Sequence, residues 1–111
     1  MSKKSVVGAT ITILILLALA QGLRWFVRAR TVSASNSCIN NLRQIDGAVQ
    51  QWALEHDAAT NTVVTMEDIK HYLGRGVEGE IPKCPHNGPY SISRVCQPPH
   101  CSIGGPDHTL P

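Results

Sequence analysis

The stretch that decides the fold is SVVGATITILILLALAQGL, residues 5–23, which lies between Lys4 and Arg24 and carries no formal charge. A helix rises about 1.5 Å per residue, so a helix of this length measures close to 30 Å, the thickness of a bilayer's hydrocarbon core. A helix of a globular core would not usually be so uniformly apolar. We therefore predict a membrane anchor. Its aliphatic side chains are those of Ile11, Ile13, Leu14, Ile15, Leu16, Leu17 and Leu19.

Basic and aromatic residues border this apolar segment. Trp25 and Phe26 follow it, as suits the headgroup boundary of a membrane. Residues 1–30 contain five basic side chains and no acidic one, whereas residues 31–111 contain five basic and eight acidic side chains. The basic excess thus flanks an apolar helix and does not form the folded basic surface that nucleic acid requires. We expect residues 1–30 to be a membrane anchor or leader region, with no nucleic-acid partner.

The same segment also fits a cleaved secretory signal. Lys3 and Lys4 would be its basic region, and Ala18-Leu19-Ala20 would be the small-residue cleavage site before Gln21. Cleavage after Ala20 would release a small, disulfide-rich binding module instead of an anchored protein. Both alternatives export the rest of the chain, residues 31–111, which we call the head.

A second helix signal runs through the first part of the head. Apolar side chains recur there at alternating steps of four and three, which places them on one face of a helix. We expect a helix over 31–56 that continues the anchor and forms the spine of the head. A break could fall at 31–36, where serine and asparagine side chains compete for backbone hydrogen bonds. The predicted core stripe consists of Cys38, Leu42, Ile45, Val49 and Trp52.

The sequence of the remainder of the head predicts one short helix and two short strands. Thr65 and Asp68 have the spacing of a capping box, which starts a short helix that Gly74 ends. Glycine and proline are frequent beyond Gly74 and preclude long helices there. Short strands over 90–93 and 101–103 predict a hairpin. The expected fold class is therefore α+β, a long N-terminal transmembrane-to-head helix packed by a short helix and a small antiparallel sheet.

The four cysteines predict disulfides. An exported head with a small core is normally stabilised by such bonds, because its compartment is oxidising. Cys84 with Cys101 would close the glycine- and proline-rich tail, and Cys96 with Cys38 would tie that tail to the long helix. A bridge of this loop size contributes roughly 3 kcal/mol.

A zinc site is the alternative interpretation of the tail. Zinc binds thiolates and imidazoles tetrahedrally, but the spacings of these residues match no closed zinc motif. Export also disfavours free thiolates, so we expect no metal and no cofactor. The thiol and imidazole residues of this region are Cys84, His86, Cys96, His100, Cys101 and His108.

The sequence offers little for catalysis. Disulfide bonding would consume the thiol that a cysteine–histidine nucleophile pair needs. The acidic residues Asp46, Glu55, Glu67 and Asp68 have the spacing of helix-surface charges, and no glycine-rich phosphate loop follows a strand. We expect neither an enzyme nor a small-molecule substrate.

Two stretches of the long helix carry a resemblance to known proteins. CINNLRQIDGA at 38–48 and QWALE at 51–55 are similar to the helix of short pilin-like proteins of Verrucomicrobia and related bacteria. Through them the chain resembles type IV pilins, and among these the major pseudopilins of type II secretion. The tail segments that resemble theirs are 82–85, 88–90, 101–102 and 105–110.

The resemblance implies a structural role. It implies a subunit of a pilus or pseudopilus, single-pass in the bacterial inner membrane, with its head in the periplasm or in an assembled extracellular filament. It also implies self-association, or association with other pilin-like subunits, through the N-terminal helix.

The leader and the last loop depart from the pilin pattern. Pilin leaders end in glycine, usually followed by phenylalanine, with glutamate at the fifth mature position. Here Ala9 follows Gly8, and Ile13 stands where the glutamate belongs. Major pseudopilins also bind calcium through a carboxylate-bearing loop near the C-terminus. That site is not carried over, because Asp107 is the only acidic residue after Glu80.

Overall fold

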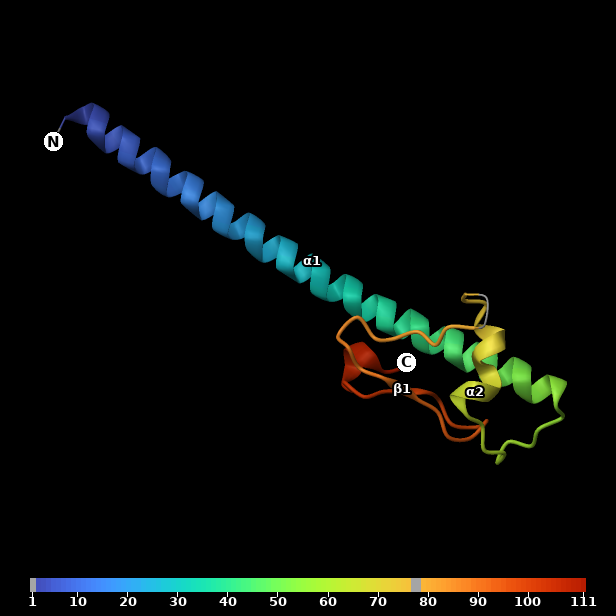
Figure 1. Ribbon diagram of the computed structural model, residues 1–111. Coiled ribbons are helices and arrows are strands. Elements are labelled where there is room, and N and C mark those ends of the chain that lie inside the picture. The colour runs from blue at the N-terminus through green and yellow to red at the C-terminus, as the bar shows by residue number, and fades with distance from the viewer. Residues whose placement is uncertain (1, 77–78) are drawn as a thin grey trace. The chain divides into compact units, whose positions relative to one another are not determined.

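The computed structural model of the protein describes residues 2–76 and 79–111. Two compact units divide the chain, Met1–Ser33 and Ala34–Pro111, and the second corresponds to the head (Figure 1). The described residues confirm a long apolar N-terminal helix, a short helix and a small antiparallel sheet. The elements in chain order are α1 (Lys3–Glu55), α2 (Met66–Ile69), the 3-10 helix η1 (Lys70–Leu73), β1 (Tyr90–Ser91), β2 (His100–Cys101) and the 3-10 helix η2 (Pro106–His108).

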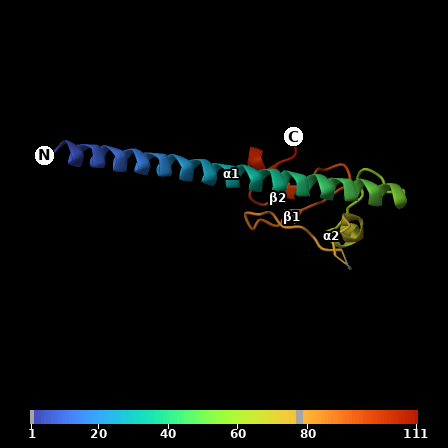
Figure 2. The same ribbon diagram turned by 90° about the horizontal axis from the view of Figure 1, so that it is seen from above.

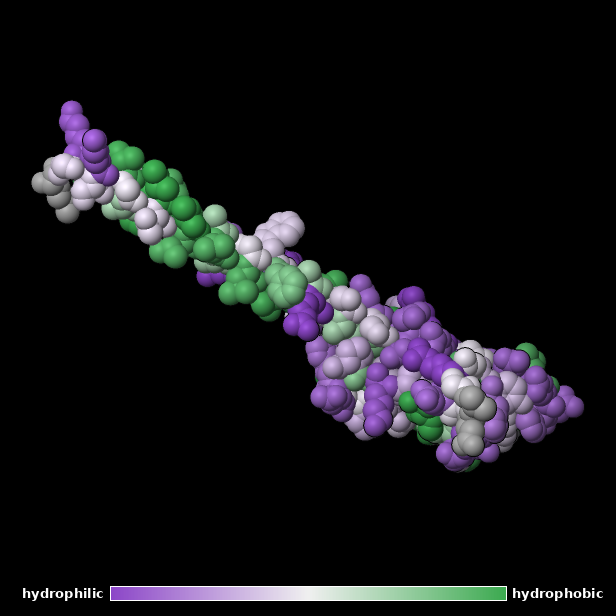
Figure 3. Space-filling view, turned by 45° about the horizontal axis from the view of Figure 1, so that its top comes forward, coloured by the Kyte–Doolittle hydropathy of each residue, from purple (hydrophilic) through white to green (hydrophobic). Residues whose placement is uncertain are grey.

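Within the first unit, α1 presents its aliphatic side chains outward. Each of the predicted anchor residues from Ile11 to Leu19 is at least half exposed, and hydrophobic side chains gather along this unit in Figure 3. By its length and composition, α1 could cross a membrane. The sequence allowed a break in the helix at 31–36, but α1 continues through these residues. Thr31 donates its hydroxyl to the carbonyl of Val27, one turn earlier, so its side chain does not divert the helix.

Within the head, one face of α1 forms one side of the hydrophobic core. The predicted stripe is confirmed at Cys38, Leu42, Ile45 and Val49, each of which is at most 2% exposed, and Trp52 is half-buried. α2, β1 and β2 lie beside this part of α1 in both views of the ribbon (Figures 1 and 2). Buried side chains of this size stabilise a fold by about 1.5–3 kcal/mol each. The other buried apolar residues of the cluster are Ala48, Ala53, Val64, Ile69, Leu73, Cys84, Tyr90, Val95 and Cys101.

The short helix begins and ends where the sequence predicts. Thr65 and Asp68 form the capping box, in which the Asp68 carboxylate accepts hydrogen bonds from the amide and hydroxyl of Thr65. The helix continues as η1 and ends at Gly74, whose φ of 63° is left-handed. Ile69 and Leu73 turn into the core, so the capped segment closes the side of the head.

The two strands pair antiparallel but are shorter than predicted. Tyr90 pairs with Cys101 and Ser91 with His100. Instead of extending β1, the chain after it pairs with the connection that precedes α2. The amide of Val64 donates to the carbonyl of Ser93, and the amides of residues 95 and 96 donate to the carbonyls of residues 62 and 60. Pro98 and Pro99 have no amide to donate, so a longer ladder toward β2 cannot form there.

We expect Thr65→Ala to lower the free energy of unfolding by about 1 kcal/mol, because α2 loses its capping side chain. Hydrogen bonds from Thr65 lower the pKa of Asp68. The contribution of Asp68 is therefore complete above the ordinary pKa of an aspartate and is lost as the pH falls through the lowered pKa. The difference between the variant and the wild type should therefore be present at neutral pH and shrink as the pH falls below the ordinary pKa of an aspartate, about 3.9, and through the lowered pKa of Asp68.

Denaturant unfolding of the full chain in detergent, followed by circular dichroism, measures this difference. The control is Thr60→Ala, which shortens an exposed threonine in the loop before α2. Equal stability of the two variants at neutral pH would contradict the capping role of Thr65.

Candidate metal centre

Three thiols and one imidazole converge inside the head. Cys38, Cys84, Cys101 and His108 are all buried, and their potential ligand atoms lie within 4.8 Å of one another. The Nδ1 atom of His108 lies 3.4 Å from Sγ of Cys84 and 3.8 Å from Sγ of Cys101. We call these four residues the thiol–imidazole cluster. Each comes from a different segment of the chain, so the cluster exists only when the head is folded.

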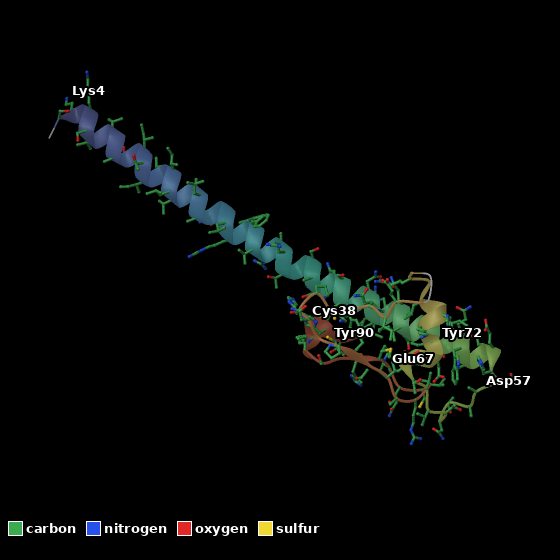
Figure 4. The ribbon with its side chains drawn as sticks, viewed as in Figure 1. Lys4, Cys38, Asp57, Glu67, Tyr72 and Tyr90 are labelled. Carbon is green, nitrogen blue, oxygen red and sulfur yellow. The ribbon has the colours of Figure 1, made fainter. Side chains whose placement is uncertain are left out.

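The helix α1 supplies Cys38. This residue is 0% exposed and lies at the N-terminal end of the core stripe. The side chain of Tyr90, from β1, lies next to it in Figure 4 and forms a hydrogen bond with its thiol. The helical spacing that buries Leu42 and Ile45 therefore also aims Cys38 at the tail.

A tight turn supplies Cys84. The amide of Asn87 donates to the carbonyl of Cys84 at 2.8 Å, and the amide of Cys84 donates to the carbonyl of Gly88 at 3.2 Å. Gly88 lets this turn approach the segment after β2, since a Cβ atom there would lie 2.7 Å from both Cγ1 of Ile103 and Oγ of Ser102. The turn thus sits close to Cys101 because residue 88 has no side chain.

Two neighbouring elements near the C-terminus, β2 and η2, supply Cys101 and His108. Cys101 is the inward-facing residue of β2, opposite Tyr90. Gly104 and Gly105, at φ values of 70° and 83°, reverse the chain after β2. This conformation is open to glycine at little cost, so η2 can bring His108 back over Cys101. His108 is 7% exposed.

The sulfur atoms differ in their electrostatic environment. Burial, together with hydrogen bonds to Cys84 and Cys101, raises the pKa of Cys38 to about 12. Burial also acts to raise the pKa of Cys84, but hydrogen bonds from the backbone of His86 and Gly88 and from the other two thiols lower it overall. The surroundings of Cys84 therefore favour the charged form of its sulfur, whereas burial at Cys38 disfavours the charged form.

A buried asparagine holds the segment that precedes Cys84. The Nδ2 atom of Asn41 donates to the hydroxyl of Tyr90 at 3.1 Å and to the carbonyl of Lys83 at 3.3 Å. Its Oδ1 atom accepts from Nη2 of Arg75 at 3.0 Å, and Arg75 also donates to Gln44. Because Asn41 lies one turn after Cys38 on α1, it fixes the tail against the helix beside the cluster.

The predicted disulfides are not present. All four cysteines are free thiols, although Cys84 and Cys101 are neighbours in the cluster. The predicted partner of Cys38, Cys96, is exposed and lies outside the cluster. The path of the tail keeps Cys96 away from Cys38, because the Cys96 amide bonds to the loop at Thr60 while Cys38 faces Cys84 and Cys101.

The structure brings together half of the residues considered as zinc ligands in the sequence. Cys84, Cys101 and His108 join the cluster, whereas Cys96 and His100 are exposed. The ring of His86 packs edge-on against that of His108, with 5.1 Å between the ring centroids. Sequence reasoning did not group Cys38 with these ligands. The available signal was its position on the buried stripe, which faces the tail.

The cluster has the donor atoms of a metal site. Thiolate sulfur and imidazole nitrogen are soft or borderline ligands, and three sulfurs with one nitrogen are a known donor set of structural zinc sites. Four protein donors would fill a tetrahedral shell, which leaves no position for a substrate. The cluster can therefore hold a metal ion within the fold, and a catalytic metal would need an open position that this donor set does not provide.

We expect Asn41→Ala to lower the free energy of unfolding by roughly 1–3 kcal/mol, because the buried Tyr90 hydroxyl and Lys83 carbonyl each lose a hydrogen-bond partner. Denaturant unfolding of the full chain in detergent measures this loss. The matched control is Asn40→Ala, which truncates the exposed neighbour of the same residue type and should change stability by less than about 0.5 kcal/mol. Similar losses in both variants would show that the contacts of Asn41 contribute nothing specific.

Comparisons with known proteins found no relative of this chain. The chain matches no protein-family model, no curated protein and no solved structure.

Proposed function

We propose that the protein is a membrane-anchored structural subunit of a pilus-like or pseudopilus-like assembly, with an exported head. The observation that carries this proposal is the apolar segment of α1, whose side chains are outward-facing throughout residues 5–23. Aliphatic side chains exposed on every side of a helix are stable in lipid or against other apolar helices, and unstable in water. The bacterial inner membrane is the proposed location of the anchor, and the periplasm or an extracellular filament that of the head.

Residues beyond the candidate signal cleavage site favour a retained anchor. Leu23, Trp25 and Phe26 follow Ala20 and are 65%, 80% and 61% exposed. A product that began at Gln21 would carry these side chains into water at the start of a helix. In an anchored protein they lie where aromatic and basic residues meet the headgroups, beside Arg24 and Arg28. The secreted binding module is therefore the second alternative.

The composition of the segment favours helix–helix association. Helices in lipid associate through van der Waals packing, and small residues let their backbones approach closely. Gly8, Ala9 and Gly22 are small and exposed, and a Cβ atom at either glycine would meet no other atom within 4 Å. Other copies of the chain, or other pilin-like subunits, are the proposed partners. The resemblance of most of residues 38–111 to pilin-like proteins supports the same role.

We expect Leu16→Arg to release the protein from the membrane fraction or to prevent its insertion, because a charge at the centre of the segment costs about 2.5–3.5 kcal/mol. The measurement is alkaline extraction of membranes from bacteria that express the full chain. Leu54→Arg is the control, since Leu54 is exposed on the head and its replacement should leave the protein in the membrane. N-terminal sequencing of the wild type then identifies its processing.

In that sequencing, a start at Met1 supports an uncleaved anchor, and a start at Ala9 supports pilin-like processing. A soluble exported protein that starts at Gln21 would contradict the proposal and support the secreted module. Equal extraction of Leu16→Arg and the wild type would also contradict it.

Self-association has its own expected result. Single cysteines placed in turn along residues 11–19 of a Cys96→Ser chain should form oxidative dimers in membranes at every third or fourth position, because one face of a packed helix meets its partner. The Cys96→Ser chain without an added cysteine is the control, because its remaining thiols are buried in the head. Monomers at every position would contradict assembly through the N-terminal helix.

A further inference from the structure

We propose that Cys38, Cys84, Cys101 and His108 bind one structural zinc ion, which joins distant segments of the head in place of disulfide bonds. This site is independent of the proposed assembly function, because all four ligands lie within Ala34–Pro111.

The spacing of the donor atoms fits tetrahedral zinc. With Zn–S near 2.3 Å and Zn–N near 2.0 Å, tetrahedral angles place neighbouring ligand atoms about 3.5–3.8 Å apart. The Nδ1 atom of His108 lies 3.4 Å from Sγ of Cys84 and 3.8 Å from Sγ of Cys101, and the ligand atoms of all four residues fall within 4.8 Å of one another. An ion at the centre would therefore require only small side-chain movements.

The ligand types and their burial select the metal and its role. Thiolates and imidazole favour zinc over calcium and magnesium, which prefer oxygen ligands. Each of the four residues is at most 7% exposed, so the ion would be shielded from water. A complete shell of protein ligands in a closed site is the arrangement of structural zinc.

The surroundings of the cluster compensate its charge. Binding would release one proton from each of the three thiols, so zinc with three thiolates and a neutral imidazole carries a net charge of −1. Hydrogen bonds from the backbone of His86 and Gly88 to the sulfur of Cys84, and a hydrogen bond between Tyr90 and Cys38, offset part of this charge. Such contacts to ligand sulfurs position the ligands and stabilise the charged site.

A disulfide bond would involve only two of the four residues of the cluster. A bond between Cys84 and Cys101 needs sulfur atoms about 2.0 Å apart and would leave the thiol of Cys38 and the ring of His108 buried without a ligand role. Zinc uses all four donors at once. It also joins α1 to the turn at Cys84, to β2 and to η2, and so connects segments distant in sequence, whose closure stabilises a small head most.

The test uses the full chain, purified in detergent through an affinity tag that contains no histidine. Elemental analysis should give about one zinc ion per chain for the wild type and for Cys96→Ser, which replaces the cysteine outside the cluster. Cys84→Ser and Cys101→Ser should retain little or none. Alkylation after denaturation without reductant should modify all four cysteines of the wild type.

Cobalt substitution tests the ligands without depending on the stability of these variants. The cobalt-loaded wild type should show the intense visible bands of a tetrahedral ion and sulfur-to-cobalt charge transfer. His108→Cys keeps four ligands and should keep the tetrahedral bands, with stronger charge transfer because a fourth sulfur binds.

Three results would overturn the zinc site. They are a wild-type chain that holds no zinc after purification and reconstitution, a disulfide between any two of Cys38, Cys84 and Cys101, and equal zinc content in Cys84→Ser and Cys96→Ser. Each leaves the proposed membrane anchoring and assembly intact, since those are tested by substitutions at residues 11–19.

Discussion

The head depends on covering one face of α1 with a tail that is poor in large apolar side chains. Leu42, Ile45 and Val49 must be buried, but beyond Gly74 the chain supplies few side chains of comparable size. Cys84, Cys101 and His108 bring three separate parts of the tail to Cys38 on the same helix face, and the proposed zinc ion would attach them to it. A tail held at three points can cover a helix without a large core of its own, and a core of this size alone is near the lower limit for stability.

The contacts around the cluster follow from the same constraint. Asn41 binds Lys83 and Tyr90, so the residues before and after the Cys84 turn are fixed to α1. Gly88 permits close approach to Ser102 and Ile103, and Gly104 and Gly105 reverse the chain so that His108 returns to Cys101. The residues at these positions are small or polar because the close approach, the chain reversal and the hydrogen bonds described above require it. The first unit has a different requirement, because its exposed aliphatic side chains must be surrounded by lipid or by another apolar helix.

Local patterns predicted much of the fold. The period of the stripe from Cys38 to Val49 and the Thr65–Asp68 capping box depend on residues close in sequence, and both appear as expected. The strands and the cysteines depend on contacts between distant segments. Ile92 and Ser93 were expected in a hairpin, but Ser93 bonds to the loop before α2, which no local pattern could show. Likewise, oxidising export favours disulfides, and only the folded tail shows that Cys38 faces Cys84 and Cys101 while Cys96 stays exposed.

X-ray absorption at the zinc edge of the purified full chain tests the central claim most directly, because it reports the atoms around the metal itself. The expected spectrum contains three sulfur atoms near 2.3 Å and one nitrogen atom near 2.0 Å from the zinc ion. A zinc shell of oxygen and nitrogen atoms, or the absence of a zinc edge in folded protein, would contradict a tail held to α1 by this cluster through a metal ion.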